Sequence, residues 1–267
     1  MIVVAERINA TRKQIARAIE ERDEELIKDQ ARKQDEAGAT YIDINAAISP
    51  AKELDAMKWA VGMVREAVPE VPLAIDSASV EVMRAGLELA GGGDVFLNSI
   101  TGEKERLEGL LPLAAEFGTK VVALAMDDRG LPETVDGRFE ALEVIFEATD
   151  AAGIERERVF VDPLVRPIST NPAEAANCLE VIRRIKAECG GAKTICGLSN
   201  VSFGLPQRNL LNRAFLALCL GAGLDAALID PLAPGVMATV LAAEALFGRD
   251  EYCMTYIQAE RAGKLEQ

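Results

Sequence analysis

Short apolar runs alternate with longer amphipathic segments along the whole chain. Each run is rich in β-branched residues and nearly continuous in apolar character, which is typical of parallel strands that are buried on both faces. The segments between the runs repeat apolar residues at helical spacing, so each predicted strand is followed by helical sequence. The predicted strands begin near Ile2, Tyr41, Leu73, Val95, Val121, Val159, Thr194 and Ala226.

Capping residues mark where several of the predicted helices begin. Thr11 opens a capping-box pattern in the first crossover, and Asp23 is expected to cap a second helix in the same crossover. Ser79 stands directly before another amphipathic segment. Asn171 precedes a proline and stands three residues before Glu174, and this is the strongest helix start in the chain.

Eight strand–helix units at similar spacing predict an α/β protein with a single (β/α)8 TIM barrel. The chain of 267 residues has the length of such a barrel. No change of composition and no linker divides it, so residues 1–267 are expected to form one domain. An open doubly wound sheet is the competing architecture, but no Gly-x-Gly-x-x-Gly motif follows the first strand.

Composition and charge exclude several classes of function. The net charge is −14, and an acidic surface repels phosphate backbones and anionic lipid, so neither nucleic acid nor a membrane is expected as a partner. The chain has no His, which excludes a Ser-His-Asp triad, an imidazole base and a His-ligated zinc ion. Its five Cys show no CxxC pair, and the sequence predicts no bound metal. Without a signal peptide or a long apolar segment, a cytoplasmic location is expected.

Polar residues close nearly every predicted strand, at the end of a barrel where active sites lie. Asp76, Asn98, Asp162 and Asn200 each follow a strongly apolar run, so they are expected low in the barrel mouth and partly removed from water. Buried carboxylates and amides need hydrogen-bond partners, and a flat heterocycle with N–H donors and ring acceptors supplies them. The set fits a 2-amino-4-oxo-pyrimidine ring, with sugar acids and other polar metabolites as alternatives.

Four further strand-end residues have a structural interpretation beside the functional one. Asp43 and Asn45 fit ligand contact and a capping or supporting role equally well. Asp127 and Asp230 are expected to be turn or helix-cap residues.

Six strand-end motifs and one helix motif follow one another in order along the chain. They are Glu6-Arg7-Ile8-Asn9, Asp43-Ile44-Asn45, Ile75-Asp76-Ser77, Leu97-Asn98-Ser99, Val161-Asp162-Pro163, Gly197-Leu198-Ser199-Asn200-Val201-Ser202 and Arg208-x-x-x-Asn212-x-x-Phe215. With these motifs the chain resembles the methyltetrahydrofolate:corrinoid-protein methyltransferases, and it is similar to the folate-binding barrel of cobalamin-dependent methionine synthase.

The resemblance implies transfer of a methyl group between N5 of tetrahydrofolate and the cobalt of a corrinoid. Tetrahydrofolate or 5-methyltetrahydrofolate would be the substrate, a separate corrinoid protein would supply the cobalamin, and the enzyme would be a homodimer. Asn200 would be the catalytic residue, because its amide oxygen would accept a hydrogen bond from protonated N5. The resemblance also assigns Asp76, Asn98, Asp162, Gly197, Ser199 and Arg208 to pterin binding, and Glu6, Asn9, Asp43 and Asn45 to positions around it.

Two other functions and three details stay open at this level. A dihydropteroate synthase would need cations for a pyrophosphate leaving group, and the late loops offer Arg208 alone. A pterin-binding protein without catalysis is the other alternative. The direction of transfer is not given, and no general acid is identifiable, so proton delivery through a network that includes water is the hypothesis. Residues 203–206 either contact the corrinoid domain or fold onto the barrel.

Overall fold

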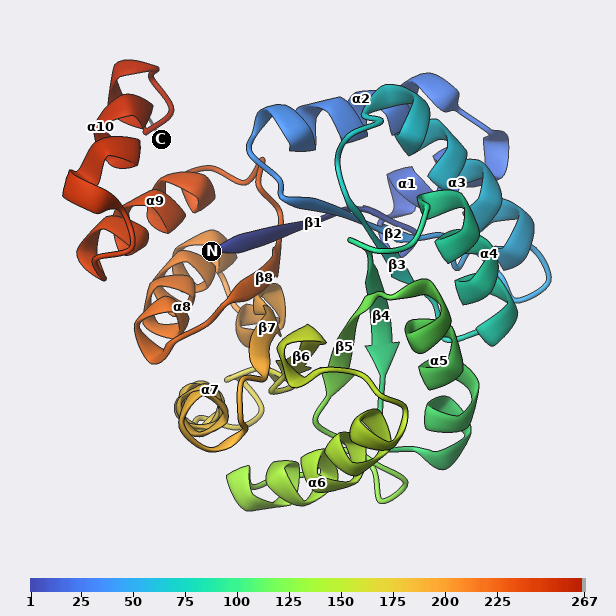
Figure 1. Cartoon of the computed structure of the whole chain (residues 1–267). Helices are drawn as coiled ribbons and strands as arrows, with labels where there is room; N and C mark the ends of the chain where they lie inside the picture. The colour runs from blue at the N-terminus through green and yellow to red at the C-terminus, as the bar shows by residue number, and fades with distance from the viewer. Residues whose placement is uncertain (266–267) are drawn as a thin grey trace.

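The computed structural model describes residues 1–265, which form a closed parallel barrel of eight strands surrounded by helices (Figure 1). The strands follow one another around the barrel in chain order, and β8 pairs with β1 to close it. The predicted TIM barrel is therefore confirmed. The strands are β1 (Ile2–Asn9), β2 (Tyr41–Asn45), β3 (Leu73–Asp76), β4 (Phe96–Ile100), β5 (Lys120–Leu124), β6 (Val159–Asp162), β7 (Lys193–Gly197) and β8 (Ala226–Ile229).

Helices cover the outside of the barrel, and the first crossover holds two of them, as predicted. A short 3-10 helix, η2 (Leu198–Ser202), follows β7 and lies at the barrel mouth. The α-helices are α1 (Lys13–Glu21), α2 (Glu24–Glu36), α3 (Glu53–Ala67), α4 (Val80–Ala90), α5 (Lys104–Phe117), α6 (Val135–Ala151), α7 (Glu174–Glu188), α8 (Arg208–Ala222), α9 (Val236–Leu246) and α10 (Met254–Arg261).

Two of the predicted helix caps are confirmed. The Asp23 side chain accepts a hydrogen bond from the backbone N–H of Leu26, and Ser79 accepts one from Val82. The capping box at Thr11 is wrong, because α1 begins at Lys13 and the Thr11 hydroxyl donates to Asn9 Oδ1.

The predicted start of α7 is also wrong in detail. Asn171 Oδ1 accepts from the Ala173 N–H in the turn before the helix, and the helix itself begins at Glu174. Glu174 does not fold back to complete a capping box, because its carboxylate is fully buried between two arginines, Arg138 and Arg166.

The core has an inner and an outer part. Inside the barrel, the Tyr41 and Phe160 rings pack edge-on against the Phe96 ring, with centroid distances of 4.7 and 4.8 Å. Small and branched residues from the other strands fill the rest of the interior. The outer part lies between the strands and the helices. Because side chains fill the lower barrel, a ligand of this barrel is expected at its mouth.

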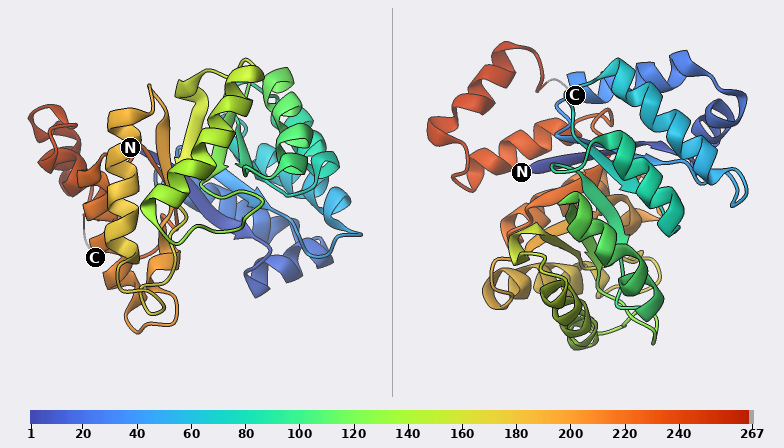
Figure 2. Two further views of the ribbon diagram at one scale, coloured as in Figure 1. Left: turned by 90° about the horizontal axis from the view of Figure 1, so that it is seen from below. Right: turned by 45° about the vertical axis from the view of Figure 1, so that its right-hand side comes forward.

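The C-terminal helices lie at the edge of the molecule, with α10 outside the ring of helices (Figure 2). The chain after α9 forms a short 3-10 helix, η3 (Glu251–Cys253), and α10, while residues 266–267 lie outside the described part. Leu246 and Tyr252 expose 82 and 84% of their surface here. No helix within residues 1–265 has the length and apolarity that a membrane span requires.

Arg138 on α6 and Glu174 on α7 form a completely buried ion pair. Arg166 adds two hydrogen bonds of 3.1 and 3.0 Å to Glu174 Oε2. Two of the Arg138 nitrogens, Nε and Nη1, have no hydrogen-bond partner among the described residues. The pair therefore fixes α6 against α7 at the cost of removing two charges from water.

Replacing Glu174 by Ala leaves buried arginine charge without a carboxylate, so we expect a loss of about 3–5 kcal/mol in the free energy of unfolding. Urea unfolding followed by circular dichroism measures this loss. Glu116→Ala, which breaks the exposed Arg84–Glu116 pair, is the matched control and should leave the unfolding midpoint nearly unchanged. Equal midpoints for the two variants would contradict the assigned role of the buried pair.

Candidate functional site

The register of the strands brings polar residues side by side at the barrel mouth. Asn45 is paired with Asp76, and Asp76 is paired with Asn98, so three neighbouring strands end in one polar row. Asp43, two residues before Asn45, lies below that row and is 1% exposed. Asp162 ends β6 on the far side of the mouth.

Two hydrogen bonds connect the residues of β2, β3 and β4. Asn98 Nδ2 donates to Asp43 Oδ1 at 3.0 Å, and Asn45 Nδ2 donates to Asp76 Oδ2 at 3.0 Å. The second oxygen of Asp43 is buried and has no partner among the described residues. Burial raises the pKa of Asp43 well above its ordinary value, and the nearby Asp76 charge adds to this; burial likewise raises the pKa of Asp76.

Asp162 is held in place by backbone groups. Its Oδ1 accepts from the Leu164 N–H at 2.7 Å, and its Oδ2 accepts from the Gly197 N–H at 3.2 Å. Burial raises the pKa of Asp162 to about 7 despite these two bonds. A carboxyl group at 8% exposure and with this pKa is a ready acceptor for a ligand that brings its own N–H donors.

Gly197 separates Asp162 from Asn200. A Cβ atom added at Gly197 would lie 3.8 Å from Asp162 Oδ2 and 3.8 Å from Asn200 Nδ2, so the glycine leaves the space between the two side chains open. Asn200 itself lies on η2 and is exposed. A planar ligand held by Asp162 would therefore extend toward the amide of Asn200.

Arg208 holds η2 in position. Its Nη2 donates to the Ser199 carbonyl oxygen at 2.6 Å, and its Nε donates to Ser202 Oγ at 3.1 Å. Ser202 Oγ in turn donates to Asn212 Oδ1 at 2.7 Å. These bonds fix the turn that carries Asn200, so the structure gives Arg208 a positioning contact at the site.

Glu6 lies at the mouth between β8 and η2, in a cluster of charges. Arg12 is 3.8 Å from its carboxylate. Asp230, at the end of β8, accepts from Arg7 Nη1 at 2.8 Å and from Arg12 at 3.4 Å. Burial raises the pKa of Glu6 to about 7, and the Asp230 charge adds to the effect while Arg12 opposes it. Asn9 lies next to this cluster, since its side-chain oxygen accepts from the Thr11 N–H and its carbonyl oxygen accepts from the Arg12 N–H.

The expectation for Asp127 and Asp230 is confirmed. Asp127 accepts from the Arg129 N–H in its turn, and Asp230 accepts from the Leu232 N–H. Sequence reasoning missed the second role of Asp230, which binds the two arginines after β1. It also missed Arg12, because no strand-end pattern marks a residue that reaches the mouth from the following loop.

Phe203, just after η2, is 63% exposed beside the mouth. Its side chain therefore stays in solvent, while its carbonyl oxygen accepts from Ser169 Oγ at 3.0 Å, so the two alternatives for residues 203–206 remain predictions. The Phe203 ring lies 5.8 Å from the Arg208 guanidinium.

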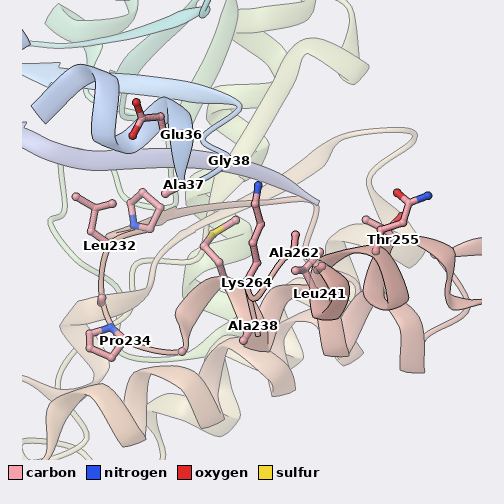
Figure 3. A pocket seen from close by; sticks show the side chains of 16 residues that line it. Glu36, Ala37, Gly38, Leu232, Pro234, Ala238, Leu241, Thr255, Ala262 and Lys264 are labelled. Atoms are coloured by element: carbon pink, nitrogen blue, oxygen red, sulfur yellow. The ribbon is translucent and has the colours of Figure 1, made fainter. Parts of the chain in front are cut away.

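Cavities occur at the mouth and elsewhere. A cavity of about 50 Å³ lies between Glu6, Ser199, Asn212 and Asp230. A larger cavity of about 660 Å³ lies outside the barrel between the end of α2, the segment after β8 and the helices α9 and α10 (Figure 3). None of the predicted site residues is among the described residues that line this larger cavity. Across residues 1–265, no group of three His, Cys, Asp or Glu side chains is placed to hold a metal ion.

Comparison with known proteins agrees with this geometry. The sequence pattern of the family described as pterin-binding enzymes matches residues 5–230, from β1 to the end of β8. The chain belongs to the pterin-binding enzymes. Among members of curated function, the methylcorrinoid:tetrahydrofolate methyltransferase of Eubacterium limosum is 37% identical, over 99% of this chain and 98% of that protein.

A longer curated protein and a solved structure are also similar to this pterin-binding enzyme. The methionine synthase of Mycobacterium leprae is 32% identical over 86% of the chain, which corresponds to 20% of that longer protein. The dihydropteroate synthase of Xanthomonas albilineans has the same fold, with a TM-score of 0.69 over 94% of each chain and 23% identity. The second likeness concerns the fold alone.

The raised pKa of Asp162 predicts how the stability of this pterin-binding enzyme depends on pH. The folded state keeps a proton that the unfolded chain loses near pH 3.8, so the stabilisation is complete below that pH and is lost as pH rises to about 7. Asp162→Asn removes the effect. As pH rises through this window, the free energy of unfolding of the wild type should therefore fall relative to that of the variant by roughly 1.4 kcal/mol per pH unit. Urea unfolding across the window tests this, and a constant difference would contradict it.

Proposed function

We propose that this protein transfers a methyl group between a methylated corrinoid carried by another protein and N5 of tetrahydrofolate. The observation that carries the proposal is the position of Gly197, which puts no side chain between the buried acceptor Asp162 and the amide of Asn200. The methylcorrinoid:tetrahydrofolate methyltransferase of Eubacterium limosum, similar over nearly its whole length, supports this substrate pair. Residues 1–267 would act together as one pterin-binding unit.

The pterin would be held mainly by carboxylates and amides at the ends of three strands. Asp162 would accept from the exocyclic amine and the adjacent ring N–H, because an ionised carboxylate accepts two parallel bonds. Pterin donors favour that ionised form, so binding would lower the pKa of Asp162 from about 7. Asp76 and Asn98 would contact the ring edge, and Ser199 and Gly197 would line its path toward Asn200.

The difficult part of the reaction concerns the charge on N5. When tetrahydrofolate is methylated, the N5 lone pair attacks the methyl carbon, and the cobalt–carbon bond breaks with its electron pair left on cobalt. N5 becomes positively charged in the transition state. The amide oxygen of Asn200 would accept a hydrogen bond from the N5 proton and stabilise that charge. In the reverse direction the same bond makes the amine a better leaving group.

The corrinoid must approach the face of the pterin that η2 leaves open. Phe203, three residues after Asn200 and 63% exposed, would contact the incoming corrinoid domain. A homodimer would use another surface. The exposed apolar side chains of Leu246 and Tyr252 near α9 and α10 support that arrangement, since large exposed apolar patches mark association surfaces.

Asp162→Ala should abolish measurable tetrahydrofolate binding, because the ring N–H groups lose their acceptor. Isothermal calorimetry with tetrahydrofolate and 5-methyltetrahydrofolate measures the affinity. Asp127→Asn is the matched control, since Asp127 is a buried mouth carboxylate whose contacts are with Arg129. Wild-type protein that binds neither folate would contradict the proposed function.

Asn200→Ala should slow methyl transfer by about 10²–10³-fold while folate binding changes much less. Single-turnover transfer from 5-methyltetrahydrofolate to free cob(I)alamin, followed by the visible spectrum of methylcobalamin, gives the rate. Circular dichroism checks that the variant is folded. An unchanged rate at saturating folate would exclude the assigned role of Asn200.

A further inference from the structure

Glu6 and the turn that carries Asn200 enclose the same small cavity. The cavity has a volume of about 50 Å³. It is lined by Glu6 of β1, Ser199 of η2, Asn212 of α8 and Asp230 at the end of β8. This volume is sufficient for a water molecule, which needs about 10–15 Å³ and two to four polar partners. A water held here would lie between the Glu6 carboxyl group and the residue next to Asn200.

Charged groups approach Glu6 from every neighbouring element. Arg12 comes from the loop after β1, Asp230 from β8, Arg208 from the start of α8, and Asp43 from β2 inside the mouth. The two arginines favour the ionised carboxylate, whereas burial and the Asp230 charge favour the neutral acid. About a fifth of the Glu6 side chain is exposed, so the group can exchange its proton with the mouth.

We propose that Glu6 gives and receives the N5 proton through a water molecule in this cavity, which makes it the proton-relay residue of the proposed methyl transfer. The inference rests on the proposed function and answers a point that the sequence left open, the source of the proton. When tetrahydrofolate is methylated, N5 carries both the new methyl group and its proton. This proton is hydrogen-bonded to the Asn200 amide oxygen while the methyl group is transferred; it then leaves that bond and passes through the water to the Glu6 carboxylate. In the reverse direction the Glu6 acid protonates N5 before the carbon–nitrogen bond breaks, and the methyl group leaves to Co(I).

None of Asp162, Asp76 and Asp43 lines this cavity, and each accepts a hydrogen bond elsewhere in the mouth. Asp162 accepts two backbone N–H bonds and faces the space over Gly197, where the pterin ring would lie. Asp76 accepts from Asn45, and Asp43 accepts from Asn98. Glu6 borders the cavity at Ser199, and its pKa of about 7 lets it act both as acid and as base near neutral pH.

The test is the pH dependence of single-turnover demethylation of 5-methyltetrahydrofolate by free cob(I)alamin. In the wild type, the rate should fall as pH rises through about 7, because the reactive form carries the proton on Glu6. Glu6→Gln cannot donate a proton and should lose about 10²-fold or more in rate together with this inflection. Calorimetry should give the same folate affinity for both proteins. Glu140→Gln, an exposed glutamate paired with Arg129, is the matched control and should keep rate and inflection.

Two neighbouring variants separate a proton relay from a structural role. Asp230→Asn removes a negative neighbour of Glu6 and should move the inflection to lower pH. Arg12→Gln removes a positive neighbour and should move it to higher pH. A Glu6→Gln protein with the wild-type rate and inflection, or an inflection that neither neighbour moves, would overturn the inference while wild-type transfer still supported the proposed function. Wild-type protein that neither binds folate nor transfers methyl would overturn both.

Discussion

The pairing of β8 with β1 is the constraint on which the rest of this protein depends. Closure gathers the ends of all eight strands around one mouth, so residues as distant in sequence as Glu6, Asp162 and Asp230 share a small volume. It also fixes which residues face one another, because the register aligns Asn45, Asp76 and Asn98 across three strands. Packing of Phe96 between Tyr41 and Phe160 fills the barrel below the mouth, so the polar strand ends lie above a floor of aromatic rings.

Burial then raises the pKa values of the carboxyl groups at the mouth. Removing them from water favours their neutral forms, and the balance of neighbours decides how far each one shifts. Asp162 keeps two backbone donors and a pKa of about 7, whereas Asp43 has one side-chain donor, a nearby Asp76 and a pKa that is raised well above its ordinary value. Hence one ring of similar residues can contain, in our proposal, both pterin acceptors and a proton relay.

The sequence predicted most of the fold and much of the composition of the site. The predicted first residue of each strand agrees with the structure to within one residue, because parallel strands buried on both faces are nearly continuous in apolar residues. The start of α7 was wrong because Glu174 serves a long-range ion pair with Arg138, and local capping patterns carry no information about a partner on another helix. For the same reason the contacts of Asp230 with Arg7 and Arg12 could not be read from the strand ends. The raised pKa values of the mouth carboxyls could not be predicted from the sequence either, because they depend on burial and on neighbours in three dimensions.

The neutral carboxyl groups also change the net charge of the folded protein. A formal charge of −14 counts every Asp and Glu as ionised. Near neutral pH the raised pKa values let Asp43 and, in part, Glu6 and Asp162 hold protons that the same groups lose in the unfolded chain, so each of these groups makes the native barrel less anionic. Folding therefore takes up protons from the buffer, and native protein migrates more slowly toward the anode than its composition suggests. The enthalpy of unfolding thus includes the heat with which the surrounding buffer accepts the released protons.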